Sequence, residues 1–353
     1  MIVLAVVGTR PQFVKAALVS RALRRSHREI LVHTGQHYDD EMSALFFREL
    51  ELPEPDEHLM VGSGTHAEQT ARMLVGVEGA IGRAKPDVVL VYGDTNSALA
   101  GALAAVKMGV PVVHVEAGCR SYDRTMPEEI NRVMIDHTSR LLLCPTSRAV
   151  RNLAREGITE GVHWVGDVML DLLRNHLPRA EQRSQILQTL GLAPASYLVA
   201  TIHRASNTDC TERLCAILEA LEQVERPVVV PVHPRTRRAM SALGRTWNPR
   251  VRFIDPVGYL DMLVLLRHAQ MVLTDSGGIQ KETFFLGIPC LTLRDTTEWE
   301  ETVEAGWNRL VGTDRAAIVE AVRSWTPTGT PSDGVFGGGR AVERIVEVLA
   351  HAS

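Results

Sequence analysis

Short apolar segments rich in valine, isoleucine and leucine alternate with longer amphipathic segments along the chain. In the first half the apolar segments are IVLAVV (2–7), EILVHT (29–34), DVVLVY (87–92), VPVVHV (110–115) and RLLLCP (140–145). Residues 13–25 and 96–108 lie between them and have helical spacing of apolar positions with few helix breakers. Continuous apolar strands joined by helices are typical of a parallel sheet covered by helices on both faces. We therefore expect a doubly wound, Rossmann-like α/β domain over about residues 1–165.

The same alternation starts again in the second half of the chain. Its apolar segments are YLVATI (197–202), RPVVVPV (226–232), VRFIDP (251–256), QMVLTD (270–275) and IPCLTL (288–293). Residues 325–340 are rich in Gly, Pro, Ser and Thr, after which AVERIVEVLAH has helical periodicity. At roughly 100 to 200 residues per domain, 353 residues accommodate two domains. We expect a second Rossmann-like domain over residues 166–335, and a C-terminal helix in 336–353 that packs back on the N-terminal domain.

Charge, hydropathy and cysteine usage exclude several classes of protein. The formal net charge is -4 and the sequence pI is about 6.4, which argues against a nucleic-acid partner. No apolar run approaches the roughly 20 residues that span a bilayer, so no membrane association is expected. The five cysteines are scattered without zinc-ligand spacing, and neither a disulfide framework nor a metal site is indicated. A cytoplasmic location is expected.

Polar motifs of the first half follow the ends of expected strands, where ligands of open α/β sheets bind. GTRPQFVK (8–15) follows the first strand and opens a helix, which places Arg10 and Lys15 at a natural anion site. A tight turn with a solvated arginine explains this motif equally well. The absence of GxGxxG and GxxxxGK[ST] argues against a dinucleotide site or a Walker-type site.

Three further motifs of the first half supply carboxylates. Asp94 in GDTNS directly follows a strand and could be a helix cap. Glu116 in VPVVHVEAG ends an apolar strand, where an unpaired carboxylate would be costly to bury. Glu128 and Glu129 in MPEEINR lie in the first turn of a helix, and a favourable interaction with the helix dipole explains one of the two. Three carboxylates at adjacent strand and helix ends suit the removal and return of a proton at a carbon.

The second half repeats this placement with basic residues. His203 and Arg204 in ATIHRASN follow one strand, and His233 in VPVHPRTRR follows the next. Each could also be an ordinary polar loop residue.

The most specific local pattern is LTDSGGIQKETFFLGIP (273–289). A strand ends at Asp275, and Ser276, Gly277 and Gly278 then open a helix whose N-terminus can bind a phosphate. Glu282 lies further along this helix, near where a ribose attached to that phosphate would fall. RDTTEW (294–299) follows the next strand and is expected to form a wall of the same site.

Taken in order, GTRP, GDTNS, HVEAG, MPEEINR, HR, TDSGGIQKE and RDTTEW closely resemble the motifs of the non-hydrolysing UDP-N-acetylglucosamine 2-epimerases, from Gly8 to the terminal helix. The resemblance implies a GT-B fold, in which two Rossmann-like domains enclose the active site in the interdomain cleft. It also implies a small-molecule UDP-sugar as substrate, a homodimer, and no requirement for NAD, another cofactor or a catalytic metal.

The resemblance further implies a role for each motif residue. The catalytic carboxylates fall on Asp94, Glu116 and Glu128, and His203 assists the departure of UDP. The residues expected to bind the UDP-sugar are Arg10, Lys15, Arg132, Arg204, His233, the phosphate-binding Ser276, Gly277 and Gly278, and the ribose-binding Glu282. The implied reaction removes the C2 proton, expels UDP to leave 2-acetamidoglucal, and returns UDP and a proton on the opposite face. Which carboxylate is the base and which the acid stays open.

The chain departs from the usual family pattern at Gln12, Ser206 and Lys281, where glutamate is common, and at Trp299, where some relatives have arginine. These differences mark a branch of the family and leave the preferred sugar open. A UDP-2,3-diacetamido uronic acid is a rival substrate, and its carboxylate would need an extra cation near C6. A GT-B glycosyltransferase and a hydrolysing epimerase are rival activities for a chain with these motifs.

Overall fold

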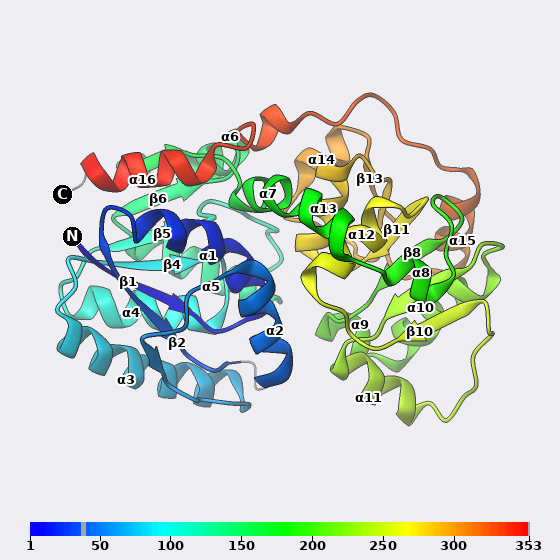
Figure 1. Cartoon of the computed structure of the whole chain (residues 1–353), viewed down its shortest axis with the longest axis horizontal. Coiled ribbons are helices and arrows are strands. Elements are labelled where there is room, and N and C mark those ends of the chain that lie inside the picture. The colour runs from blue at the N-terminus through cyan, green and yellow to red at the C-terminus, as the bar shows by residue number, and fades with distance from the viewer. Residues whose placement is uncertain (37–39, 352–353) are drawn as a thin grey trace. The chain divides into compact units, whose positions relative to one another are not determined.

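The computed structural model describes residues 1–36 and 40–351, with side chains for all of these except residues 40–44. The chain divides into two compact units, Met1–Arg174 with Asp333–Ser353, and Asn175–Ser332. Each unit contains one sheet of parallel strands with helices on both faces (Figure 1). The α/β class and the two successive sheets expected from the sequence are confirmed.

The first unit has a seven-stranded sheet in the order β3-β2-β1-β4-β5-β6-β7. The strands are β1 (Ile2–Val7), β2 (Arg28–His33), β3 (Glu57–His58), β4 (Val88–Tyr92), β5 (Val112–Val115), β6 (Leu141–Cys144) and β7 (Val162–Trp164). The strand order changes direction between β1 and β4, and ligands of such sheets bind outside the carboxyl ends at this point. The first-half motifs begin at these ends, since Gly8 follows β1 and Gly93 follows β4.

Helices cover both faces of this sheet (Figure 1). On one face α1 (Arg10–Leu23) contacts α2 (Asp40–Leu50) and α16 (Ala341–His351), and on the other α4 (Asn96–Lys107) contacts α3 (His66–Ala84) and α5 (Pro127–Thr138). The unit also contains α6 (Ser147–Arg155), the start of α7 (Val168–Arg183) and a short 3-10 helix, η1 (Asp333–Phe336). Ala341, Ile345 and Leu349 of α16 recur every four residues and are fully buried.

The second unit has a six-stranded sheet in the order β10-β9-β8-β11-β12-β13. The strands are β8 (Leu198–Thr201), β9 (Val228–Pro231), β10 (Val251–Ile254), β11 (Met271–Thr274), β12 (Cys290–Thr292) and β13 (Asn308–Leu310). The order changes direction between β8 and β11, so the segments that follow these two strands lie at the corresponding switch point. His203 and Asp275 belong to these segments.

Eight helices of the described residues surround the second sheet: α8 (Ile186–Leu190), α9 (Ala205–Thr208), α10 (Thr211–Gln223), α11 (Pro234–Ala242), α12 (Tyr259–Arg267), α13 (Gly277–Leu286), α14 (Glu300–Glu304) and α15 (Arg315–Ser324). α10 contacts α15, and both contribute buried side chains to the main apolar core of this unit. α12 contacts α8 and α13.

The two units divide within α7, at Arg174, whereas the sequence pattern places the first boundary near residue 165. The physical reason is that the first turns of α7 stay with the first sheet. The Arg174 side chain donates to the carbonyl oxygen of Gly338 at 2.6 Å and pairs with Asp333, and the Asp171 carboxylate accepts the N–H of Val342 at 2.8 Å.

Candidate active site

The side chain of Gln12 joins the ends of β1 and β4. Its amide oxygen accepts the backbone N–H of Gly8 at 2.8 Å, and its amide nitrogen donates to the carbonyl oxygen of Tyr92 at 3.1 Å. Gln12 is fully buried. Because a glutamate would offer no N–H to the Tyr92 carbonyl, these contacts explain a glutamine at this position.

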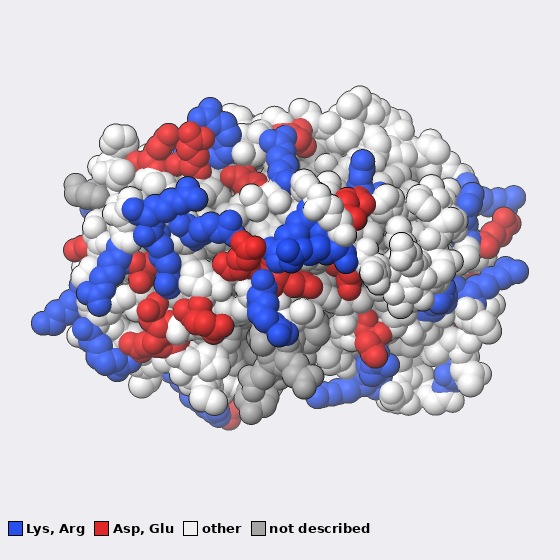
Figure 2. Space-filling model, viewed as in Figure 1, with Lys and Arg blue, Asp and Glu red and all other residues white. Residues whose placement is uncertain are grey.

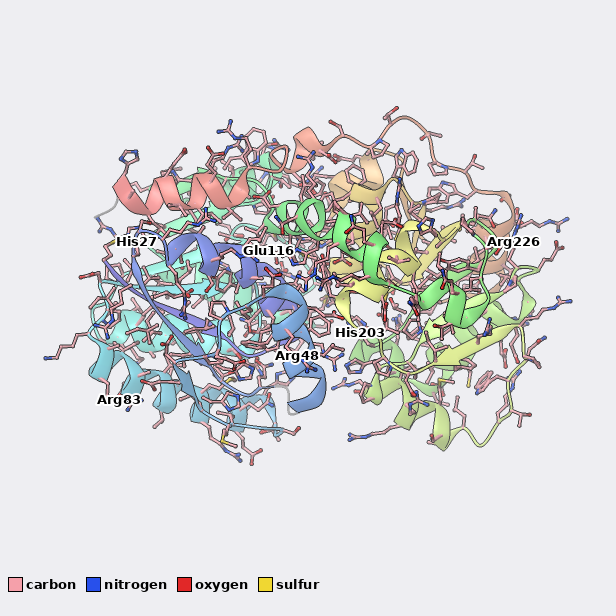
Figure 3. All side chains as sticks on the ribbon, viewed as in Figure 1. His27, Arg48, Arg83, Glu116, His203 and Arg226 are labelled. Carbon is pink, nitrogen blue, oxygen red and sulfur yellow. The ribbon has the colours of Figure 1, made fainter. Side chains whose placement is uncertain are left out.

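Lys15 and Glu116 form a buried ion pair, with Nζ 2.6 Å from Oε1. Lys15 lies on α1 and Glu116, labelled in Figure 3, directly follows β5. The backbone of Glu116 has a φ of 72°, a left-handed conformation that few residues other than glycine adopt. Gly93 lies against the pair, since a Cβ there would be 2.7 Å from the Lys15 Nζ. A strained backbone at a charged strand end is typical of functional sites.

Asp94 is bound by an arginine and does not cap helix α4. The Thr95 hydroxyl caps this helix by accepting the N–H of Ala98 at 3.2 Å. The Asp94 carboxylate instead accepts a hydrogen bond from Nη2 of Arg132, and its side chain is 20% exposed. The helix-cap role considered from the sequence therefore belongs to Thr95, and the Asp94 carboxylate stays partly open to solvent.

The two adjacent glutamates of α5 have different surroundings. Glu129 is buried and accepts hydrogen bonds from the backbone N–H groups of Ser121 and Tyr122, both at 2.9 Å, and from Arg132 at 2.7 Å. Glu128 is partly exposed and has no hydrogen bond or ion pair with the described residues. Glu129 is therefore held within the fold by its hydrogen bonds, whereas Glu128 stays partly open to solvent.

In the second unit, the buried carboxylate of Asp275 organises the segment after β8. It accepts the backbone N–H groups of His203 and Arg204 at 3.0 Å and the side-chain amide of Asn207 at 3.1 Å. The Nδ1 of His203, labelled in Figure 3, lies 3.2 Å from Oδ1 of Asp275. The His203 side chain is 37% exposed, so the ring is oriented by a buried carboxylate while it stays accessible to a ligand.

The N-terminus of α13 combines a serine cap with a glycine and a nearby ionised cluster. The Ser276 hydroxyl accepts the N–H of Ile279 at 3.5 Å. A Cβ at Gly277 would lie 2.5 Å from Oε1 of Glu298. Arg204 and Arg294 lie 3.2 Å and 2.8 Å from the Glu298 carboxylate. Two cations and the positive end of a helix dipole thus lie around the Glu298 carboxylate, beside a helix N-terminus of the kind that binds anions.

Gly278 lies in the same first turn, and Glu282 follows one turn later. Glu282 is buried beside the phenol of Tyr259. Burial, and after it the neighbouring Glu282 carboxylate, raises the pKa of the Tyr259 phenol well above its ordinary value. Lys281 is also buried, with its Nζ 4.0 Å from the centre of the Trp299 ring. Lys281 and Trp299, two positions at which the chain differs from the usual family pattern, therefore form one cation–π contact.

The remaining two candidates lie at the first turns of helices. His233 caps α11, because its Nδ1 accepts the N–H of Arg235 at 3.2 Å, and its ring centre is 5.7 Å from that of His203. Arg10 opens α1, and its guanidinium lies 5.5 Å from the centre of the Phe46 ring.

No helix of the described residues is long and apolar enough to cross a membrane. In residues 1–36 and 40–351, no group of three or more His, Cys, Asp or Glu side chains is arranged to hold a metal ion. Basic and acidic side chains are interspersed on the face that Figure 2 shows.

Comparison with known proteins assigns the family. A model of the UDP-N-acetylglucosamine 2-epimerase family matches residues 21–350. The chain belongs to this family. A protein of Methanococcus maripaludis described as a UDP-N-acetylglucosamine 2-epimerase homolog is 48% identical over 99% of both chains. The UDP-2,3-diacetamido-2,3-dideoxy-D-glucuronate 2-epimerase of Pseudomonas aeruginosa is 49% identical, also over 99% of both chains.

The fold of this epimerase-family chain matches that of a solved relative. The structure of the UDP-GlcNAc 2-epimerase of Methanocaldococcus jannaschii in complex with UDP-GlcNAc and UDP is similar with a TM-score of 0.92 and 41% identity, over 99% of both chains. The GT-B-type α/β fold expected from the sequence is thereby confirmed, and the chain is an isomerase.

Three residues that organise the sites of this epimerase-family chain were not among the sequence candidates. Asp275 orients His203, Glu298 lies beside the first turn of α13, and Gln12 joins two strand ends. Asp275 has a recognisable signal, since it follows its strand as Asp94 does. The contacts of Gln12 and Glu298 connect residues far apart in the sequence and have no local signal.

Proposed function

We propose that the protein interconverts UDP-N-acetylglucosamine and UDP-N-acetylmannosamine by inverting the configuration at C2. The observation that carries the proposal is that Asp94 and Glu116 follow adjacent strands of the first sheet, while Arg132, one turn after Glu128 on α5, binds Asp94. Glu116 and Asp94 follow adjacent strands and are each paired with a cation, whereas Glu128 has no such partner among the described residues. In such a set, two carboxylates are fixed by their cations while a third can gain or lose a proton.

The proposed reaction is an elimination followed by an addition. A carboxylate removes the C2 proton, the bond between C1 and the UDP oxygen breaks, and a C1–C2 double bond forms, which gives 2-acetamidoglucal and UDP. UDP then adds back to C1, and a carboxyl on the opposite face returns a proton to C2. Asp94, Glu116 and Glu128 supply the base and the acid, and His203, oriented by Asp275, assists the departure of UDP.

The second unit supplies the nucleotide site in this proposal. The N–H groups of the first turn of α13 and the arginines beside it suit a diphosphate. Ser276, Gly277 and Gly278 bind the phosphates, and Glu282 binds the ribose hydroxyls. The binding set is completed by Arg10, Lys15, Arg132, Arg204 and His233. We also expect a homodimer with a solution mass of twice 38.9 kDa.

Product analysis tests this function. The purified protein is incubated with UDP-N-acetylglucosamine, and the nucleotide sugars are separated by ion-exchange chromatography. Conversion to a constant ratio of UDP-N-acetylglucosamine and UDP-N-acetylmannosamine is the expected result. Steady release of UDP with free N-acetylmannosamine would assign a hydrolysing activity. Transfer of the sugar to an acceptor without epimerisation would assign a glycosyltransferase.

A second candidate substrate is a UDP-2,3-diacetamido uronic acid. The 49% identity to the Pseudomonas aeruginosa 2-epimerase for such a sugar supports it. The same chromatographic assay with both substrates in parallel distinguishes the two. A kcat/KM at least tenfold higher for the uronic acid would identify it as the substrate, with the C2 chemistry unchanged.

A further inference from the structure

The buried side chain of His114 connects the turns that carry Asp94 and Glu116. His114 lies on β5, two residues before Glu116, and is fully buried. Its Nε2 lies 2.8 Å from the carbonyl oxygen of Gly93, the residue before Asp94. Its Nδ1 lies 2.7 Å from Oδ1 of Asp136 on α5. The ring therefore contacts the turn of Asp94 directly, and Asp136 connects it to the turn of Glu116.

Asp136 binds the second turn through its other oxygen. Its Oδ2 accepts the backbone N–H of Gly118 at 3.1 Å and a hydrogen bond from Arg120 at 2.7 Å. Gly118 lies two residues after Glu116 and has a φ of 77°, and a Cβ there would be 2.4 Å from the carbonyl oxygen of Ala149. The turn that starts at Glu116 is thus closely packed, and Asp136 fixes its far end.

The hydrogen-bond partners determine how many protons the His114 ring carries. A carbonyl oxygen can only accept, so Nε2 donates to Gly93. Burial raises the pKa of the Asp136 carboxyl, but His114 and Arg120 lower it further, and the net pKa lies below its ordinary value. With the buried Arg120 guanidinium bound to its other oxygen, Asp136 is ionised, so Nδ1 also donates to Oδ1. The buried charges are balanced, because Asp136 compensates the ring and Glu156 holds Arg120 through two hydrogen bonds of 2.7 Å.

We propose that His114, donating from both ring nitrogens, is a positioning residue that fixes the turns of Asp94 and Glu116 relative to one another. The inference rests on the proposed function, in which the carboxylates of these turns act on the proton at C2. Proton transfer requires the carboxylate within hydrogen-bond reach, and a displacement of about 1 Å can lower a rate on the order of 100-fold. His114 contacts the backbone of one turn and the carboxylate that holds the other.

Two substitutions of His114 separate its two hydrogen bonds. The amide nitrogen of asparagine takes about the position of Nδ1, and that of glutamine about the position of Nε2. His114→Asn therefore loses the bond to Gly93 and should lower kcat by about 10- to 100-fold. His114→Gln keeps that bond but loses the bond to Asp136, so it should lower kcat by about 10- to 100-fold as well. Because the phosphate-binding and ribose-binding residues of the proposal lie in the second unit, the Kd for UDP should stay within about twofold in both variants, measured by titration calorimetry.

Glu29→Gln is the matched control. Glu29 is also a buried carboxylate of the first unit, held by Ser20 and Arg24, but it lies near the start of β2 and not at the carboxyl edge. We expect this variant to lose stability in urea denaturation and keep the wild-type kcat. A wild-type kcat in His114→Asn would overturn the proposal. An equal fall in kcat in His114→Asn and Glu29→Gln for an equal loss of stability would also overturn it, because kcat would then follow stability alone.

The protonation of the ring is tested separately by NMR of protein labelled with 15N-histidine. One histidine should show two ring N–H correlations in the wild type, and both should be absent from the spectra of His114→Asn and His114→Gln. A ring with a single N–H at position 114 would overturn the assignment of two donors. If the wild type converts neither sugar, the proposed function fails, whereas this spectrum still tests the protonation of His114.

Discussion

Glu128 and Glu129 are neighbours in the sequence and have different surroundings in the structure. Glu129 is enclosed by N–H donors from the turn before α5 and by Arg132, while Glu128 has none of these contacts. At the scale of single residues, burial and hydrogen bonds thus distinguish a carboxylate that holds the fold from one that can exchange a proton.

The paired variants Glu128→Gln and Glu129→Gln test this distinction. Glu128→Gln should lower kcat by about 100-fold or more and leave the melting temperature close to that of the wild type, as for a lost acid or base. Glu129→Gln should destabilise the protein by about 1–3 kcal/mol, because its amide nitrogen would face backbone donors. Steady-state kinetics and thermal unfolding provide both readouts. Near wild-type turnover in Glu128→Gln would transfer the catalytic role to Glu129.

The first turn of α13 is the element on which nucleotide binding depends in the proposed function. Gly277 leaves space for the Glu298 carboxylate, and a Cβ would lie 2.5 Å from it. Gly277→Ala should therefore displace Glu298 and weaken UDP binding by about tenfold, which corresponds to about 1.4 kcal/mol. Ser196→Ala, at a partly exposed position of the same unit, is the control and should bind UDP as the wild type does. Unchanged UDP affinity in Gly277→Ala would rule out this helix end as the phosphate site.

The sequence was sufficient to predict the long apolar strands and the polar motifs at their ends. Both follow from the residues themselves, since continuous valine, leucine and isoleucine runs require burial and the next residues must turn. Strands β3, β7 and β13 were missed because their two or three residues include polar side chains and belong to no continuous apolar run, unlike the equally short β12. Whether Asp94 or Thr95 caps α4, and which partner Gln12 has, depend on contacts between distant residues.

At the scale of the whole molecule, the proposed functions are divided between the two units. The carboxylates belong to the first unit, and the α13 phosphate site and His203 belong to the second. Substitutions of the carboxylates should therefore lower kcat, and substitutions in the first turn of α13 should raise the Kd for UDP. Substitution of His203 should lower kcat, because this residue assists the departure of UDP.

The stability of the fold against acid should depend on Asp136. Its pKa is lower in the folded protein, so ionised Asp136 stabilises the fold above the ordinary aspartate pKa of about 3.9, and this contribution is lost as the pH falls further. Asp136→Asn should thus be less stable than the wild type near neutral pH, with a difference that shrinks below about pH 4. Urea denaturation at a series of pH values measures this. A difference that stays constant down to about pH 3 would argue against a stabilising charge on Asp136.

The central claim is that carboxylates of the first unit remove and return the proton at C2 of a UDP-sugar. The most direct measurement is the reaction with UDP-N-acetylglucosamine in D2O, followed by proton NMR. We expect UDP-N-acetylmannosamine to form with deuterium at C2, and the C2 proton signal of the remaining substrate to disappear as the reaction reverses. Formation of UDP-N-acetylmannosamine that retains its C2 proton would contradict the account.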